Sequence, residues 1–523
     1  MQQPRLQLPR GRATLRVACK VTRRQGAPAK PSQAGPGPLQ IDLEKVYSDG
    51  SVLPARQVGP IRVASIPGKG RGLVALCTLQ PGDLLLVCQP LGPLGRGPEG
   101  IEPRPDDLLA VLQREGVLSE GDRRRLALLS DGSPASQRQE VRLEELDPSS
   151  AATHTPPVAL QAKGFGAKPS KPTASQPADS SSRELGADWL RQVVSLNAWG
   201  TATGELGVCG SRGEASHSFI GLWPEVGLLN HSCAPNTALM LVGDRLLLRA
   251  AANIPSGGEL LTSYLDAQGR LPLSERRAVL QTCYGFTCAC PRCKEEEDAP
   301  AEVQAALGSM WQQVARGGVE QQLGSLLTAL SAALEAGEAA KASQAAEQLQ
   351  QLVATLSCLT AGLEQAMEAA GLQQQARRWL RASAYTFYKG VAMAQDAIQE
   401  WRRKSGAGGL MHPDPSLPAE LLALVTVFAP LSDSHLYLSL DWLAREGEAS
   451  GKEAARTAEA ARECLSSHIA RYGRVNNARL THIMTERGKV RHSLGVIDTP
   501  TPWAAAPAPT GSSSSHPVQL LAT

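Results

Sequence analysis

Apolar residues change their spacing along the chain, and this change separates two kinds of structure. Between residues 58 and 91, short apolar runs alternate with turns rich in glycine and proline, which predicts β-strands. The runs lie at residues 61–64, 73–75 and 83–87. Between residues 300 and 495, leucines recur every three or four positions, which predicts helices stacked as an antiparallel, tetratricopeptide-like array.

Several segments depart from both patterns. Residues 105–130 carry leucines at helical spacing, whereas residues 147–184 are rich in Pro, Ser, Ala and Thr and are expected to form a disordered loop. The Gly- and Ser-rich residues 200–218 are expected to form a mobile loop. The charged run at 294–298 is expected to be a solvated linker, and the basic stretch 474–491 a solvated face.

Composition and charge narrow the function only slightly. The net charge of +3 is too small to indicate nucleic-acid or membrane binding. No run of 18 apolar residues occurs, so no transmembrane helix is expected. The first 40 residues hold six Arg and two Lys without any acidic residue, which is typical of an organelle transit peptide and equally of a disordered basic tail.

Cysteine spacing gives the strongest chemical signal. The chain has 11 cysteines, an odd number, and residues 288–293 read Cys-Ala-Cys-Pro-Arg-Cys. One dense cluster among scattered cysteines favours a metal site in a reducing compartment over a disulfide framework. Tetrahedral Zn²⁺ needs four ligands, and Cys233 is the expected fourth, with Cys283 as its rival and free thiols as the alternative. The expected ligands are Cys233, Cys288, Cys290 and Cys293.

Four segments resemble signatures of the SET-domain protein lysine methyltransferases. Residues 230–236 read Asn-His-Ser-Cys-Ala-Pro-Asn, the family's Asn-His-Ser-Cys-x-Pro-Asn signature. Residues 258–264 resemble its Gly-Glu turn and the strand that ends in tyrosine, and residues 69–75 its first strand pair with a cofactor loop. Residues 284–293 resemble the post-SET zinc segment of the SET-and-MYND (SMYD) branch. The implied fold class is α+β, a SET β-fold with a post-SET zinc segment followed by an all-α helical domain.

The resemblance implies methyl transfer from S-adenosyl-L-methionine (SAM) to a lysine side chain of a histone or non-histone protein. The amine must first lose a proton, since free lysine has a pKa of about 10.4, and an apolar channel disfavours its charged form. Tyr264 is expected to orient the amine, with Tyr284 and Trp199 shaping the channel; for both tyrosines the alternative is a core position. The residues expected to hold SAM are Lys69, Arg71, Asn197, Asn230, His231 and Phe286. For Lys69 and Arg71 the alternative is a solvated turn.

The chain also departs from the SMYD pattern. A MYND finger needs seven cysteines and one histidine, yet no cysteine lies between Cys88 and Cys209, and His154 is the only histidine there. A MYND finger is therefore excluded from this insertion, and partner recognition through it is in doubt.

Together these patterns predict a monomer that binds a lysine-bearing protein and neither nucleic acid nor membrane. A catalytically inactive scaffold that binds a partner through its helical domain is the alternative. A transit peptide would place the chain in a plastid or mitochondrion; otherwise the family implies nucleus or cytoplasm. The expected segments are a disordered basic N-terminus (1–57), the first part of the SET domain (58–96), a helical insertion with a disordered loop (97–188), the SET core (189–266), the post-SET zinc segment (267–295), the helical domain (300–495) and a disordered tail (496–523).

Overall fold

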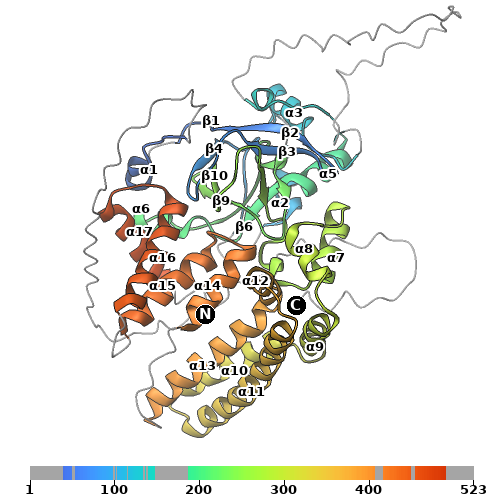
Figure 1. The fold of residues 1–523 in the computed structure, drawn as a ribbon. Coiled ribbons are helices and arrows are strands. Elements are labelled where there is room, and N and C mark those ends of the chain that lie inside the picture. The colour runs from blue at the N-terminus through green and yellow to red at the C-terminus, as the bar shows by residue number, and fades with distance from the viewer. Residues whose placement is uncertain are drawn as a thin grey trace, which may run out of the picture. The chain divides into compact units, whose positions relative to one another are not determined.

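The computed structural model describes most of the chain (Figure 1). The described residues are 39–49, 53–97, 101, 103–114, 116–133, 136, 139–147, 186–406, 416–448 and 454–490. The transit-like first 38 residues, the expected disordered loop apart from Asp147, and the tail from 496 lie outside them. None of the described helices is both long and apolar enough to cross a membrane.

Eleven strands in the described residues form three small sheets, and all neighbouring strands are antiparallel except β8 and β11. The first sheet has the order β1 (Arg56–Val58), β4 (Leu84–Cys88), β10 (Arg245–Ala250), β9 (Thr237–Val242). The second has the order β2 (Ile61–Ile66), β3 (Gly70–Ala75), β11 (Glu259–Thr262), β8 (Asn230–His231). The third has the order β5 (Gly95–Gly97), β7 (Ser218–Leu222), β6 (Ala198–Thr201). The expected strands are thereby confirmed.

The local sequence explains the strands that frame the site. Every residue of β4 is buried, in keeping with its continuous apolar run. Strands β2 and β3 form a hairpin whose turn holds Gly68 and Gly70 at φ of 75° and 79°, a conformation that side chains with a Cβ rarely adopt. Parallel pairing sets Asn230 opposite Leu261 and His231 opposite Thr262, so the Asn-His segment runs beside the end of β11.

Short helices connect and cover the sheets. They are α1 (Leu43–Asp49), α2 (Pro105–Leu112), α3 (Glu120–Leu126), η1 (Leu143–Leu146), α5 (Ala187–Asn197), α6 (Leu206–Arg212), η2 (Val226–Leu228) and η3 (Asp266–Arg270). Ser119 and Asp122 form a capping box at the start of α3. Two expectations are wrong here. Residues 43–49, expected in a disordered N-terminus, form a helix with Tyr47 wholly buried, and residues 200–218 contain α6, which packs on the C-terminal helices.

The rest of the described chain is helical, as expected. These helices are α7 (Leu273–Tyr284), α8 (Pro291–Glu297), α9 (Ala301–Gly317), α10 (Val319–Glu335), α11 (Ala339–Ala369), α12 (Gln374–Ala382), α13 (Tyr385–Ser405), α14 (Ser416–Phe428), α15 (Asp433–Glu448), α16 (Ala454–Tyr472) and α17 (Asn477–Val490). Helices α9, α10, α11 and α13 share one apolar core. The prediction of a solvated linker at 294–298 is wrong, because most of these residues belong to α8 and Glu296 is buried.

A buried ion-pair network joins α6 to the last two helices. Glu205 accepts hydrogen bonds from Tyr472 Oη at 2.6 Å and from Arg471 Nε at 3.1 Å, and also pairs with Arg487. Arg487 Nη1 lies 2.6 Å from Asp433 Oδ1. The prediction that the basic stretch 474–491 is a solvated face is therefore wrong at Arg487, which is 5% exposed. Burial alone would raise the pKa of Glu205, but the charges of Arg471 and Arg487 outweigh it and lower that pKa to about 2.

This network predicts a loss of stability in acid. The folded-state pKa of Glu205 lies below its ordinary value of 4.5, so its contribution is complete above about pH 4.5 and is lost as the pH falls towards 2. At neutral pH we expect Glu205→Gln to cost about 3–5 kcal/mol, because two arginines lose their buried partner. Urea unfolding of both proteins at pH 6, 4.5 and 3 should show the difference shrinking as the pH falls. A difference that stays constant would contradict the ionised state of Glu205.

Candidate metal and cofactor site

Four cysteine sulfurs meet at one point, as the spacing predicts. Cys233 follows β8, Cys288 and Cys290 lie in the segment after α7, and Cys293 lies in α8. Their sulfurs all lie within 4.8 Å of one another, with Cys233 Sγ 3.9 Å from Cys288 Sγ and 3.5 Å from Cys293 Sγ. Cys283, the rival fourth ligand, is not part of this group.

The distances suit a tetrahedral metal ion. A Zn–S bond of about 2.3 Å in a regular tetrahedron separates neighbouring sulfurs by about 3.8 Å. All four cysteines are free, so no disulfide competes for their sulfurs. The close contact with Cys288 raises the pKa of the Cys233 thiol, because several thiolates so close together repel one another unless a cation lies between them. The residues present therefore fit Zn²⁺.

His231 connects the sulfur cluster to the end of β11. The backbone N–H of Tyr264 donates to His231 Nδ1 at 3.0 Å, and His231 Nε2 lies 3.3 Å from Cys233 Sγ. Since Nδ1 accepts, the neutral ring carries its proton on Nε2 and donates towards the sulfur. Burial lowers the pKa of His231 to about 3, so the ring is neutral at physiological pH.

Aromatic rings gather beside this histidine. The rings of Tyr264 and Tyr284 lie 4.8 Å apart, and that of Phe286 lies 6.4 Å from Tyr264 and 6.0 Å from His231. The Tyr264 hydroxyl donates to the Leu229 carbonyl oxygen at 2.5 Å. Burial raises the pKa of Tyr264, so its hydroxyl stays protonated. These rings pack on the same small core as three of the four cysteines.

A polar cluster lies on the other side of the Asn-His segment. Asn230 Nδ2 donates to Arg71 O at 2.9 Å and to Glu259 Oε1 at 2.8 Å, and Lys69 Nζ lies 2.7 Å from Glu259 Oε2. Gly72 makes this approach possible, because a Cβ there would lie 2.8 Å from Asn230 Nδ2. Lys69 is thus an exposed turn residue that pairs with the glutamate of the Gly-Glu motif.

Asn197 reaches the same region from the end of α5. Its Nδ2 donates to Ser130 O at 2.7 Å and to Val193 O at 2.8 Å. Arg71 donates to the neighbouring Leu128 O at 2.8 Å. Among the described residues nothing donates to the Oδ1 atoms of Asn197 and Asn230, which leaves both oxygens able to accept hydrogen bonds from a ligand. These two acceptor oxygens and the cations Lys69 and Arg71 fit the amino-acid end of SAM, and the nearby aromatic rings fit its adenine end.

Trp199 belongs to a separate aromatic group. Its ring lies 5.6 Å from Phe219 and 5.9 Å from Trp223. It also lines a cavity of about 180 Å³ that reaches Ser263, the residue before Tyr264. Across this cavity lie Phe428 and other residues from α14 to α16.

Comparison with known proteins agrees with this geometry. The SET domain family matches residues 70–265, which span β3 to β11 and end one residue after Tyr264. The chain carries a SET domain. The human histone-lysine N-methyltransferase SMYD3 is 40% identical over 95 residues, 18% of this chain and 22% of the relative. The human protein-lysine N-methyltransferase SMYD4 is 36% identical over 92 residues, 18% of this chain and 11% of the relative. The Xenopus laevis N-lysine methyltransferase SMYD2-A is 36% identical over 91 residues, 17% of this chain and 21% of the relative.

The chain is thus related to the SMYD methyltransferases through its SET domain, and the matches span about a fifth or less of the relatives' own lengths. The sulfur cluster forms directly behind the SET domain, from one cysteine inside the matched region and three beyond it. The expected fold, a SET β-region followed by a cysteine cluster and packed helices, is confirmed.

The structure refines the roles expected of single residues in the SET domain. Both ring nitrogens of His231 already have protein partners, so a hydrogen bond from its side chain to SAM would have to displace one. Glu259 was noted only as part of the Gly-Glu motif, yet its carboxylate holds both Asn230 and Lys69. The two buried arginines beneath the sulfurs, Arg276 and Arg292, gave no signal in the sequence.

Gly72→Ala should disturb the polar cluster of the SET domain selectively. Its new Cβ would lie 2.7 Å from Ile66 Cγ1 and 2.8 Å from Asn230 Nδ2, so Asn230 must move. We expect stability to fall by about 1–3 kcal/mol and SAM affinity by about tenfold, equivalent to about 1.4 kcal/mol. Calorimetric titration with SAM and thermal unfolding measure both effects.

Gly362→Ala is the matched control, because nothing lies within 4 Å of a Cβ at this position in α11. It should stabilise the helix by up to about 1 kcal/mol and leave SAM affinity unchanged. Equal SAM affinity in the Gly72→Ala protein would remove the Asn230 cluster from the cofactor site.

Proposed function

We propose that this protein is a SAM-dependent protein-lysine N-methyltransferase whose Cys233, Cys288, Cys290 and Cys293 hold a structural Zn²⁺. The observation that carries the proposal is the convergence of two groups on the Asn230–His231 strand. The Tyr264, Tyr284 and Phe286 rings lie on the side of the sulfur cluster, and the Lys69, Arg71 and Glu259 polar cluster contacts Asn230.

The residues of the cofactor cluster divide the work of binding. Asn197 and Asn230 offer their amide oxygens to the ammonium group, Lys69 and Arg71 balance the carboxylate, and Phe286 packs against the adenine. When bound, SAM supplies a methyl group on a positively charged sulfur, which leaves as a neutral thioether once the methyl carbon bonds to nitrogen.

Tyr264 acts on the acceptor amine. Its hydroxyl donates to the Leu229 carbonyl, so its oxygen lone pairs remain to accept an N–H from the lysine amine and to fix the direction of the nitrogen lone pair. Burial raises the pKa of Tyr264, so the tyrosine stays protonated while the substrate amine loses its proton. The apolar ring walls disfavour the ammonium form, which must lose its proton to solvent before the nitrogen can attack.

The cavity beside Trp199 is the proposed route of the acceptor protein. It lies between the SET strands and the α14–α15 turn, and it reaches Ser263 next to Tyr264. Leu431 lies in this turn and has a φ of 56°, the only positive φ of a non-glycine residue in the described part of the chain. Such strained backbone conformations cluster at functional sites.

Transfer of a labelled methyl group from SAM onto fractionated cell proteins tests the proposal. We expect label in a protein fraction, recovered as methyl-lysine after hydrolysis, with the wild-type protein and far less with Tyr264→Phe. SAM binding without transfer to any fraction would contradict the enzyme and support the scaffold alternative.

A further inference from the structure

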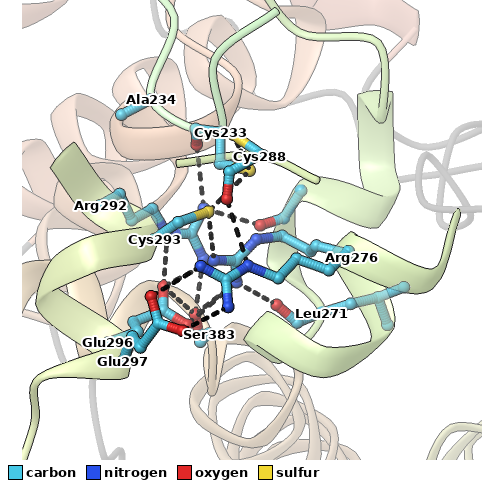
Figure 2. A network of polar contacts seen from close by, with 12 residues as sticks. Cys233, Ala234, Leu271, Arg276, Cys288, Arg292, Cys293, Glu296, Glu297 and Ser383 are labelled. Atoms are coloured by element: carbon cyan, nitrogen blue, oxygen red, sulfur yellow. Dashed lines mark hydrogen bonds and ion pairs between the residues drawn. The ribbon is translucent and has the colours of Figure 1, made fainter. Parts of the chain in front are cut away.

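Beneath the sulfur cluster lies a fully buried polar network that nothing in the cofactor site uses (Figure 2). Arg276 and Arg292 are 0% exposed, Glu296 is 5% exposed and Ser383 is 0% exposed. Figure 2 shows the two guanidinium groups lying between the cysteine sulfurs and the Glu296–Ser383 pair. Arg276 comes from α7, Arg292 and Glu296 from α8, and Ser383 from the end of α12.

Each arginine touches both the cysteines and the helical domain. Arg276 Nη2 donates to Cys293 Sγ at 3.6 Å and Nη1 to Ser383 Oγ at 3.0 Å. Arg292 Nη1 donates to Cys233 O at 3.0 Å and Nη2 to Ser383 Oγ at 2.6 Å. Both also pair with Glu296 at 2.9 Å.

Without a metal–thiolate cluster, this network carries an uncompensated positive charge. Two arginines, which stay protonated in proteins, face a single carboxylate, so a buried excess of one positive charge remains. Zn²⁺ with four thiolates carries two net negative charges, which this excess offsets in part. The nearby Arg277–Glu297 ion pair has no net charge, so it does not change the sum.

We propose that Arg276 and Arg292 stabilise the metal–tetrathiolate cluster by charge and, through Ser383, couple metal binding to the docking of α12. The hydroxyl of Ser383 accepts from both arginines and donates to Glu296 Oε1 at 2.8 Å, so α12 sits correctly only when both guanidiniums are in place. The arginines are thus positioning residues. The inference needs the metal of the proposed function but does not depend on methyl transfer.

Competition with a chromophoric zinc chelator at fixed pH tests the charge argument. Arg276→Gln should bind zinc about 10–100-fold more weakly than the wild type. Arg445→Gln is the matched control. Arg445 is also a largely buried arginine, but it lies in α15, far along the chain from the cysteines, and pairs with Asp396 and Asp441. Its replacement should leave zinc affinity unchanged.

Glu296→Gln separates charge from packing. It disturbs the same network but removes a negative charge, so zinc affinity should be equal or higher. Equal weakening by Arg276→Gln and Glu296→Gln would overturn the charge argument, as would wild-type affinity in Arg276→Gln. A wild-type protein that binds no zinc would overturn both this inference and the metal site.

Hydrogen exchange of the unaltered protein tests the coupling, whether or not the variants fold. Removal of zinc should speed exchange of backbone amides in residues 374–384, while the pairing of α10 with α11 provides an internal reference. Unchanged exchange in residues 374–384 would overturn the coupling.

Discussion

Replacement of Cys288 by serine is expected to cost the protein its metal and more than about 3 kcal/mol of folding stability. The segment after α7 packs on a small core of Cys233, Leu265, Leu280, Cys288 and Cys293, which is too small to replace a metal ion. Loss of one thiolate weakens metal binding. Folding stability then falls as well, because structural metal sites contribute their binding energy to folding. Metal content by elemental analysis and the free energy of urea unfolding measure the two effects.

Cys283→Ser is the control for this substitution. Cys283 lies in α7, five residues before Cys288, and is half-buried outside the sulfur cluster. The Cys283→Ser protein should keep one zinc per chain and nearly all of its folding stability. Equal zinc content in both serine variants would show that Cys288 is not a ligand.

Tyr264→Phe is expected to lower turnover by at least about 100-fold while SAM affinity changes little. The variant keeps the ring that packs 4.8 Å from Tyr284 and loses only the hydroxyl that the proposal places on the amine. A misplacement of the reacting atoms by about 1 Å can cost about 10²-fold in rate, so loss of the group that orients the amine has an effect of this size. Calorimetry gives the SAM affinity, and labelled methyl transfer gives the turnover.

Tyr388→Phe is the matched control. Its hydroxyl is also largely buried and donates to a protein acceptor, Glu364, but it lies in α13 within the helical domain. It should retain full turnover. Turnover in Tyr264→Phe as high as in this control would remove Tyr264 from the mechanism.

The sequence predicted those features that short-range spacing determines. Three thiols within six residues cannot be independent core positions, and the Asn-His-Ser-Cys motif supplied the fourth sulfur across 55 residues. The strand runs and the helical leucine spacing were likewise recovered, because each pattern has the period of its own element.

The features that the sequence missed depend on partners far apart in the chain. Arg487 looked solvent-exposed because its stretch is basic, yet its acceptor Glu205 lies 282 residues away. The charged run at 294–298 looked like a linker, but Glu296 turns inward to Arg276, Arg292 and, 87 residues on, Ser383. Local charge patterns cannot reveal such pairs, because the burial that makes them form is created by the tertiary fold.

We propose that a metal-bound sulfur cluster holds the post-SET segment against the Asn230–His231 strand and so completes the cofactor site. Calorimetric titration of SAM into one preparation tests it in three states: as purified, after removal of the metal, and after zinc is restored. We predict one SAM site per chain in the first state, little or no binding in the second, and recovery in the third. Equal SAM affinity in all three states would contradict the account.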